Sequence, residues 1–535
     1  MSGINRPVLR PQHGRTTAAA SVGLLRTLWL TPLDLAFRTM GFRFAWMKAV
    51  FTHTPPAVLR LTGRLRAERA AWRATTSVPA YVDLLASRGI DPAAMAPLGI
   101  LTRLPQTDKA SYIDRYRIED RCVDGSFPFA GTTLDESSGS TGRPYDWIRS
   151  AEERSVAHRN IGFFARYCFG PGPLITLNAL SMGAWAAGIN MSLGMNRHSL
   201  VKSIGPDTER ILTTLRSMGP GYRYQVGGYP PFLKHLLDVG DAEGFPWADY
   251  ELLGTVGGEG MTEELRDYLL QRFVCCYSGY GATDLEVGIA AETPVSIAVR
   301  RLVRACPDIR AALFGDDPRL PMVFQYNPLI HWIEVTPDRE LVFTISRLDL
   351  LSPRIRYNIH DQGGVLPFPT LEAALRDFGY DLRTLGEREE VWGPRGPLPW
   401  VDVVPLPFLW VNGRRDATIS IMGSNIYPED VESLLYRQAD VARVLSSFQV
   451  RVGTDEGGTP RPAIDLELTS GATLPTDRLV TLAEQLRDGM AEVNRDYRQS
   501  LAEFPAALLP LITTWAPGTG PFTGDAHRIK QRRLA

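Results

Sequence analysis

The middle of the chain alternates between short apolar runs and longer stretches in which apolar residues recur with helical spacing. Strands are predicted at residues 174–177, 222–226 and 252–256, and helices at residues 208–218, 230–239 and 261–273. Strands that alternate with helices are typical of βα units around a mainly parallel sheet. In such sheets the functional loops follow the carboxyl ends of the strands.

The flanking regions have other patterns. Residues 57–72 predict a helix with arginines on its exposed face, and residues 1–20 are expected to form a mobile arm. Apolar residues at 332–335 and 340–344 predict antiparallel strands, which we assign to a small barrel-like subdomain at about residues 320–412. Toward the C-terminus, strands at 448–452 and 464–468 precede a predicted helix at 476–494.

These elements predict an α/β protein with two domains of unequal size. The large N-terminal domain covers residues 1–414 and contains βα-layered, mainly parallel sheets and the barrel-like subdomain. The small C-terminal domain covers residues 415–535 and is expected to be a mobile α+β unit. A chain of 535 residues is too long for one hydrophobic core, which agrees with this division.

Composition narrows the function classes. Fifty-eight basic and 59 acidic residues give a net charge of -1, which argues against a nucleic-acid partner. Five cysteines without a CxxC pair argue against a zinc site and fit a reducing cytoplasm. No apolar run reaches the roughly 20 residues of a transmembrane helix, although peripheral membrane contact stays open. The oligomeric state is also open, with a homodimer as one option.

One segment rich in hydroxyl groups and glycine follows residue 136. It contains Ser137, Ser138, Gly139, Ser140, Thr141 and Gly142, and ends in Arg143 and Pro144. Glycines let backbone N–H groups approach phosphate oxygens, and hydroxyls add neutral donors. The spacing is not that of a Walker A loop. On composition alone, a phosphate-binding loop and a flexible Ser/Gly linker are equally good interpretations.

The order of residues in this loop resembles the phosphate motif of the adenylate-forming superfamily, which includes acyl-CoA synthetases, peptide-synthetase adenylation domains and luciferases. Further motifs similar to those of the superfamily follow in order up to about residue 432. The segment 422–432 resembles the phenylacetate-CoA ligase branch most closely. The loop departs from the usual pattern at Tyr145, where a lysine commonly follows the proline.

The resemblance implies roles for two glycine-containing motifs. Gly258 and Glu259 belong to a segment that flanks adenine, and the motif at residues 280–284 is similar to the superfamily's YGxTE. The resemblance places the adenine on Tyr280 and Gly281, the α-phosphate on Thr283 and Mg²⁺ on the following acid. That acid is Asp284, one methylene shorter than the usual glutamate, so Glu286 is a reserve metal ligand.

The remaining motifs concern the ribose, the domain hinge and the C-terminal tail. Asp361 is expected to bind both ribose hydroxyls, since a carboxylate accepts two hydrogen bonds from a vicinal diol. Arg414 would contact the nucleotide, and Asp416 would be the hinge between the domains. The superfamily carries a catalytic lysine near its C-terminus, for which Lys530 is the candidate and His527 the alternative.

The resemblance implies an AMP-forming acid ligase. It would use ATP and Mg²⁺ to activate a small-molecule carboxylic acid as an acyl-adenylate, with release of pyrophosphate. The acid is expected to be aromatic, because Trp185 and Tyr229 fall on loops that should line the pocket. The expected acceptor is CoA or the thiol of a carrier protein, in secondary-metabolite and particularly antibiotic biosynthesis. The alternatives are an amine or nitrite acceptor, or a degenerate scaffold that binds the adenylate without catalysis.

Overall fold

The computed structural model describes most of the chain from residue 30 to residue 523. The described residues are 30–32, 34–36, 43–95, 99–136, 145–182, 186–315, 317, 319–388, 403–414, 419–421, 424–454, 460–503, 505 and 508–523. The expected mobile arm at residues 1–20 lies outside them. No helix in the described part has the length and apolar character needed to cross a membrane.

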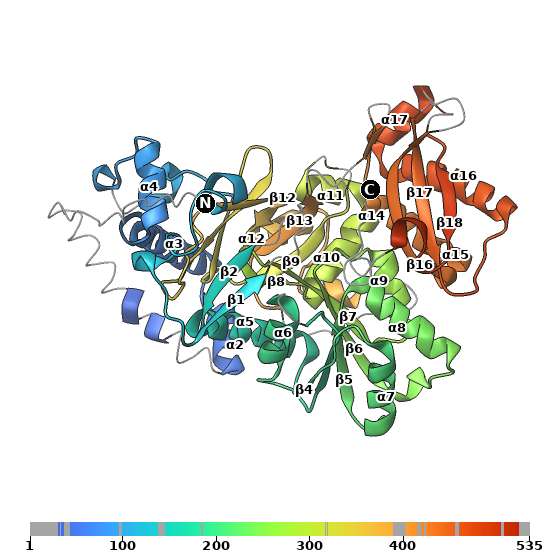
Figure 1. The fold of residues 1–535 in the computed structure, drawn as a ribbon, viewed down its shortest axis with the longest axis horizontal. Helices are drawn as coiled ribbons and strands as arrows, with labels where there is room; N and C mark the ends of the chain where they lie inside the picture. Colours follow the sequence, from blue (N-terminus) through green and yellow to red (C-terminus); the bar gives the residue numbers. More distant parts are fainter. Residues whose placement is uncertain are drawn as a thin grey trace, which may run out of the picture.

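One continuous mixed sheet forms the centre of the molecule (Figure 1). Its strand order is β10-β11-β12-β13-β9-β8-β7-β6-β5-β3-β4. The strands β3 to β7 pair parallel with one another, and all other pairs, including β7 with β8, are antiparallel. The parallel half comprises β3 (Ile175–Asn178), β4 (Leu200–Ser203), β5 (Arg223–Gly228), β6 (Glu251–Gly257) and β7 (Cys275–Ala282). The antiparallel half comprises β8 (Glu286–Ala291), β9 (Met322–Tyr326), β10 (His331–Val335), β11 (Glu340–Ile345), β12 (Tyr357–Leu366) and β13 (Phe408–Arg414).

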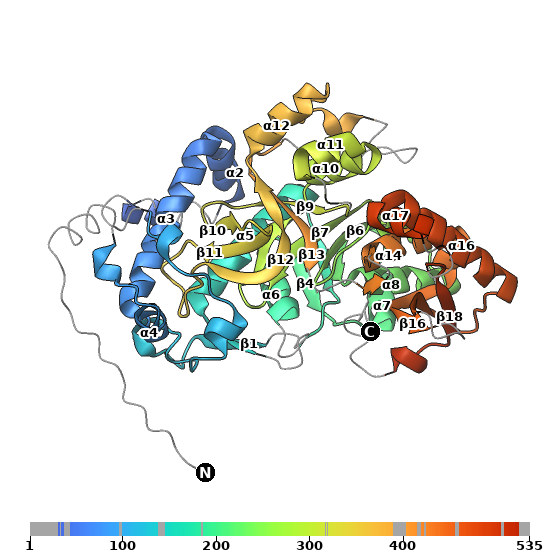
Figure 2. The ribbon, with the colours of Figure 1, turned by 90° about the horizontal axis from the view of Figure 1, so that it is seen from above.

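Helices cover the sheet, and two hydrophobic cores lie on its opposite faces, since alternate residues of β9 and β13 belong to different cores. Figure 2 shows α10, α11 and α12 together on one side of the sheet. The helices of the large domain are α2 (Phe44–His53), α3 (Pro56–Ser77), α4 (Pro79–Ser87), α5 (Ala151–Phe169), α6 (Ala186–Met195), α7 (Thr208–Met218), α8 (Pro230–Ala242), α9 (Glu263–Leu269), α10 (Pro294–Ala305), α11 (Pro307–Phe314) and α12 (Phe368–Asp377). One core lies around the parallel strands, and a second joins α3 and α4 to the antiparallel strands.

The sequence predicted these elements closely. The α/β fold class is confirmed, and the helix at 208–218 and the strands around 174–177 and 252–256 are present. Thr262 caps α9 by accepting a hydrogen bond from the Leu265 N–H at 3.2 Å. Because β8 pairs antiparallel with both β7 and β9, the strands of residues 320–412 are continuous with the parallel sheet. The barrel-like subdomain expected there stays a prediction.

The small domain has its own sheet and core. The strands β16 (Leu445–Thr454), β17 (Pro460–Leu468) and β18 (Leu511–Trp515) form a three-stranded sheet, and a separate hairpin joins β14 (Ile419–Ile421) to β15 (Ser424–Ile426). Its helices are α14 (Pro428–Arg437), α15 (Ala439–Val444), α16 (Thr476–Val493) and α17 (Arg495–Glu503). The predicted α+β architecture is confirmed, while the boundary at residue 415 stays a prediction.

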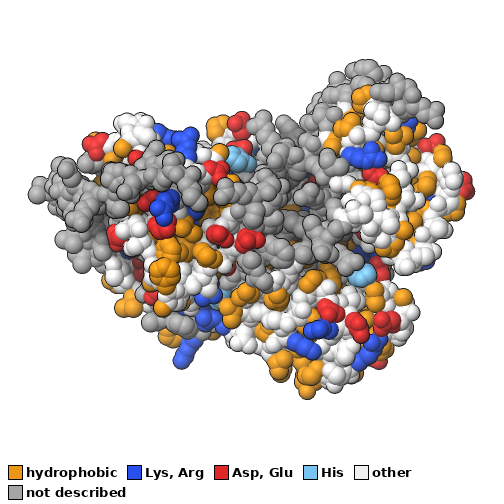
Figure 3. Space-filling view, viewed as in Figure 1, with side chains coloured by type: hydrophobic (Ala, Val, Ile, Leu, Met, Phe, Trp, Pro, Cys, Tyr) orange, Lys and Arg blue, Asp and Glu red, His pale blue; other side chains and the backbone are white. Residues whose placement is uncertain are grey.

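The small domain packs against the large one through α14 and α9. The Tyr268 and Tyr436 rings lie with their centroids 6.2 Å apart, and Arg437 Nε is 3.7 Å from the Glu264 carboxylate. Farther along, the Arg319 guanidinium lies 4.9 Å over the Tyr427 ring. The described surface carries charged groups of both signs scattered among other side chains (Figure 3), in keeping with the nearly neutral sequence.

A buried ion cluster holds the end of β7 against α9 and α10. Arg266 has no solvent exposure and pairs with Glu263 at 3.0 Å and with Glu292 at 2.6 Å. Arg300 pairs with Glu263 at 2.9 Å and donates to two backbone carbonyls. Burial alone would raise the pKa of Glu263, but the surrounding arginines hold it well below its ordinary value. The second oxygen of Glu292 accepts the Ser278 N–H at 2.7 Å, which connects the cluster to the strand.

Arg266→Met is expected to lower the free energy of unfolding by about 3–5 kcal/mol, because Glu263 and Glu292 keep their buried charges but lose a partner. Urea denaturation followed by circular dichroism measures this change. Arg272→Met is the matched control, since Arg272 pairs with Asp241 at 3.3 Å on the surface and both side chains are exposed. That control should cost less than about 1 kcal/mol. Equal, small losses in both variants would contradict the structural role of the cluster.

Candidate functional site

The end of β7 and the following turn bring the predicted site residues to the seam between the two halves of the sheet. The Tyr280 hydroxyl donates to Asp361 Oδ2 at 2.6 Å, although the residues are 81 positions apart. The Tyr280 ring packs against Phe324 and Phe343 at centroid distances of 5.6 and 6.4 Å. Burial and the charge of Asp361 raise the pKa of Tyr280 well above its ordinary value, so the phenol stays protonated and holds Asp361 in place.

Two glycines allow the backbone to pass closely here. Gly281 lies beside the backbone of β8, where an added Cβ would come within 2.9 Å of the Gly288 nitrogen. Gly258, after β6, has a φ of 84° and faces the Tyr229 ring, which an added Cβ would approach within 2.8 Å. Glu259 follows at the same carboxyl edge of the sheet. The positions predicted around the adenine therefore tolerate no larger residue at either glycine.

The Asp284 side chain has a cationic partner that the sequence did not suggest. Lys109 Nζ lies 3.1 Å from Asp284 Oδ2, and the Tyr357 hydroxyl donates to the same oxygen at 3.4 Å. Lys109 begins a short helical turn (Lys109–Ile113), which Asp108 caps by accepting the Ser111 N–H at 2.7 Å. The one available signal was the rarity of lysine, since the chain contains only Lys48, Lys109, Lys202, Lys234 and Lys530.

The lysine also contacts the residue at which the phosphate motif departs from its usual pattern. Lys109 Nζ lies 5.4 Å from the centroid of the Tyr145 ring, within the range of a cation–π interaction. The Tyr145 hydroxyl donates to Asp114 Oδ1 at 2.8 Å, which fixes the ring in this position. The ammonium group therefore lies between a carboxylate and an aromatic face, and about 30% of the lysine side chain is exposed.

The reserve metal ligand Glu286 is engaged on both oxygens. Arg347 Nη2 lies 2.6 Å from Oε1, and His331 Nε2 lies 3.0 Å from Oε2. Burial opposes ionisation, but Arg347 and His331 lower the pKa of Glu286 to about 2. The Asp284 side chain is 11% exposed against 5% for Glu286, so Asp284 is the less enclosed of the two candidate metal ligands. No cluster of three or more His, Cys, Asp or Glu side chains capable of holding a metal occurs among the described residues.

Other predicted residues lie farther along or outside the described part. Thr283 follows β7 directly, and Arg414 pairs with Asp361 in the register of β13 and β12. The start of the predicted hinge is therefore adjacent to the predicted ribose ligand. The remaining predictions fall outside the described residues: Ser137, Ser138, Gly139, Ser140, Thr141, Gly142, Trp185, Asp416, His527 and Lys530.

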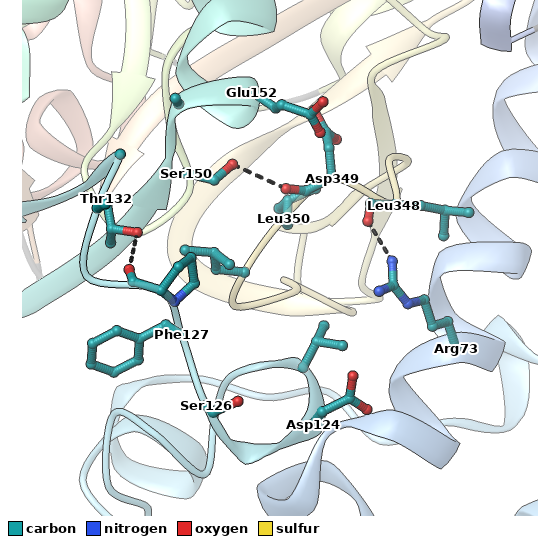
Figure 4. A pocket seen from close by; sticks show the side chains of 16 residues that line it. Arg73, Asp124, Ser126, Phe127, Thr132, Ser150, Glu152, Leu348, Asp349 and Leu350 are labelled. Atoms are coloured by element: carbon teal, nitrogen blue, oxygen red, sulfur yellow. Dashed lines mark hydrogen bonds between the residues drawn. The ribbon is translucent and has the colours of Figure 1, made fainter.

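A cavity of about 510 Å³ lies between the hairpin of β1 (Thr132–Glu136) and β2 (Asp146–Ser150), the helix α3 and residues 348–351. Figure 4 shows Arg73 entering from α3 and Glu152 and Asp349 meeting at the opposite side. None of the predicted nucleotide ligands lines this cavity. Ser150, at the end of β2, and residues 348–351, which precede β12, both line it.

Comparison with models of protein families and with curated protein sequences gives no match. Among solved structures, 2-hydroxyisobutyryl-CoA ligase in the postadenylation state with R3-HIB-AMP has a TM-score of 0.61 at 15% identity, over 91% of each chain. The same ligase with 2-HIB-AMP in that state gives 0.60 at 16% identity, over 91% of each chain. With 2-HIB-AMP and CoA in the thioesterification state, it gives 0.51 at 16% identity, again over 91% of each chain.

The chain therefore has the fold of an adenylate-forming CoA ligase, as the motifs predicted. Within that class, its architecture is that of 2-hydroxyisobutyryl-CoA ligase, and the likeness extends through the small domain because 91% of both chains is covered. The likeness is one of fold, so the activity of this chain is argued from its own residues.

Glu286→Gln is expected to lower the free energy of unfolding by about 1–3 kcal/mol at pH 7, because buried Arg347 loses one of its two carboxylate partners and keeps only Asp349 at 3.4 Å. The pKa of Glu286 is lowered by folding, so its contribution is present above the ordinary value of 4.5 and is lost as the pH falls toward 2. The difference between wild type and variant should therefore shrink below about pH 4.5 in denaturation curves. Asp440→Asn removes a surface pair with Arg478 and should show a small, nearly constant difference.

Proposed function

We propose that this protein uses ATP to activate a carboxylic acid as an acyl-adenylate and then transfers the acyl group to an acceptor. The observation that carries the proposal is the meeting of Tyr280, Asp361 and Asp284 at one edge of the sheet. These three residues come from separate motifs whose order resembles that of adenylate-forming enzymes. The fold supports the same conclusion, since the 2-hydroxyisobutyryl-CoA ligase structures contain acyl-AMP.

The described residues can bind the nucleotide in three ways. The Tyr280 ring and the backbone at Gly258 and Gly281 provide a flat, close surface for the adenine. Asp361 accepts hydrogen bonds from the ribose diol, in place of the bond from Tyr280. The Thr283 hydroxyl is placed after β7 to donate to the α-phosphate. Together these contacts align the α-phosphorus with the carboxylate that attacks it, and alignment supplies much of the rate in such displacements.

The reaction concentrates negative charge, and this chain offers cations and a metal ligand to offset it. The Asp284 carboxylate is a hard oxygen donor of the kind that Mg²⁺ prefers, and a metal held by a single carboxylate retains waters and phosphate oxygens as its other ligands. When bound, Mg²⁺ neutralises phosphate charge. Lys109 lies on the same carboxylate and can turn its ammonium group toward a phosphate oxygen. It thereby supplies a cation where Tyr145 replaces the usual lysine.

The second half-reaction requires an acceptor. CoA is the first candidate, because the solved ligase of the same fold binds it, and the thiol of a carrier protein is the second. We propose that Asp416 acts as the hinge that brings the small domain to the acceptor, and that Lys530 or His527 stabilises charge during adenylation. Arg414 next to Asp361 couples that hinge to the bound ribose. An aromatic acid fits the Tyr229 ring beside Gly258.

ATP–pyrophosphate exchange tests the proposal directly. Purified protein with Mg²⁺, ATP and labelled pyrophosphate is expected to show exchange that depends on an added aryl or alkyl acid. Tight ATP binding without exchange across a broad panel would favour a non-catalytic scaffold. With a working acid, mass spectrometry after addition of CoA, an amine or nitrite distinguishes the acceptors. Lys530→Ala and His527→Ala are tested as separate variants. The variant that loses exchange identifies the C-terminal catalytic residue.

Lys109→Met is expected to slow acid-dependent exchange by about 10²-fold, because a preorganised cation beside the developing phosphate charge is lost. The loss should appear in kcat more than in the KM for the acid. Lys202→Met is the matched control, since Lys202 donates to Thr214 at 2.7 Å on β4, at the far edge of the sheet. Wild-type rates in both variants would exclude a role for Lys109 in the first half-reaction.

A further inference from the structure

The turn that carries Thr283 and Asp284 is held by two buried arginines from distant parts of the chain. Arg149 Nη2 donates to the Thr283 carbonyl at 2.6 Å, and Arg354 Nε donates to the Asp284 carbonyl at 3.1 Å. Arg149 belongs to β2, whereas Arg354 lies between β11 and β12. We propose that Arg149 and Arg354 are positioning residues, which fix this turn relative to β2 and so place Thr283 and Asp284 against the nucleotide. The inference rests on the proposed function.

Both guanidinium groups are removed from water and share one carboxylate. The side chains of Arg149 and Arg354 are 5% and 2% exposed, so their directions are set by protein contacts alone. Arg149 Nη1 donates to Glu153 Oε1 at 2.7 Å, and Arg354 Nη1 lies 3.9 Å from the same oxygen. Because a guanidinium is a rigid planar fork, anchoring one arm on Glu153 fixes the direction in which the other arm donates.

The cluster also reaches the Asp284 side chain. The Arg354 guanidinium lies 5.0 Å over the Trp147 ring, and Trp147 contacts Tyr357 edge-on at 5.9 Å. The Tyr357 hydroxyl in turn donates to Asp284 Oδ2. The backbone and the carboxylate of Asp284 are therefore held by one connected group of side chains. A displacement of Arg354 would shift both at once.

The charge of Arg354 is incompletely compensated. Burial and the neighbouring Arg149 lower the pKa of Arg354 to about 9, and its Nη2 has no hydrogen-bond partner in the described structure. Apolar residues can replace a buried charge cluster with little loss of stability or even a gain. Packing alone therefore does not require an arginine here, whereas holding a carbonyl in a fixed direction does.

The arginines connect the turn to the strand that leaves the predicted phosphate loop. Arg149 pairs with Thr133 in the register of β1 and β2, and residues 137–144 join these two strands in the sequence. Figure 4 shows Ser150, at the end of β2, donating to the Asp349 carbonyl, and this hydrogen bond measures 3.2 Å. Asp349 precedes Arg354 by five residues. Arg73 of α3 donates to the adjacent Leu348 carbonyl. The cluster thus maintains the spacing between β2 and the turn that carries Thr283 and Asp284.

Arg149→Lys and Arg354→Lys test this inference in the full chain. Lysine keeps the charge but cannot donate in two fixed directions, so the turn should lose its position while the fold is retained. Acid-dependent ATP–pyrophosphate exchange is expected to fall by about 10²-fold, with a raised KM for ATP and a raised Mg²⁺ requirement. The KM for the acid should stay within about three-fold of wild type, since its pocket is not displaced. A merely structural role would not raise the KM for ATP while leaving the KM for the acid nearly unchanged.

Arg223→Lys is the matched control. Arg223 donates to the carbonyls of Pro171 and Phe169 at 3.0 and 2.7 Å, but from the amino end of β5, away from the site. Its exchange kinetics should equal those of wild type. Thermal unfolding followed by circular dichroism verifies that each variant is folded. If an arginine variant does not fold, Trp147→Phe takes its place, because it puts a smaller ring beneath the Arg354 guanidinium.

The outcomes separate the inference from the function on which it rests. Absence of exchange in wild type overturns the proposed function. If wild type exchanges while the folded variants at positions 149 and 354 keep the wild-type KM for ATP and kcat, the positioning role is wrong. An equal rise in KM for ATP and for the acid also overturns it. A selective effect on ATP and Mg²⁺, absent in Arg223→Lys, supports it.

Discussion

The buried cluster around Arg266 is the constraint on which the site depends. Glu263 lies on α9, Glu292 follows β8, and Arg300 lies on α10, so the ion pairs join elements on either side of β7. Glu292 accepts the Ser278 N–H, and Arg266 donates to the Cys276 carbonyl. The backbone of β7 just before Tyr280 is therefore fixed by hydrogen bonds to the side chains of the cluster. An ion cluster has the directional geometry for this task, whereas apolar packing would allow the strand to slide.

From that fixed strand, the site is built across the change from parallel to antiparallel pairing. Tyr280 lies on the last parallel strand, and its partner Asp361 lies on β12, three strands beyond β8 in the sheet. In a flat sheet, four strand spacings would separate β7 from β12 by about 19 Å. The 2.6 Å hydrogen bond between Tyr280 and Asp361 therefore requires the sheet to curl between these strands. The single mixed sheet therefore makes one rigid surface of motifs that are far apart in the sequence.

The sequence predicted the regular elements well because their signals are local. Hydrophobic periodicity predicted α7 to the residue and β6 to within one residue at each end. The motifs singled out Tyr280 and Asp361, whose side chains share a hydrogen bond in the structure, while their binding roles stay predictions. The pairing of β8 with β7 and β9 could not be predicted, since Glu286–Ala291 contains few strand signals and its partners are set by tertiary contacts. The roles of Arg149 and Arg354 could not be predicted either, since they also depend on tertiary contacts. Arginine is common in this chain, and the sequence does not show which arginines are buried.

The contact between Lys109 and Tyr145 shows how the chain can depart from a motif without losing its chemistry. Charge balance at the phosphate site depends on where a cation lies in space, and not on which segment carries it. Tyr145 lacks a charge, but its ring supports the Lys109 ammonium, and its hydroxyl is tied to Asp114. The same lysine neutralises Asp284 when no other cation is near. Under the proposed function, the cation that is missing at position 145 is supplied by Lys109, 36 positions earlier in the sequence.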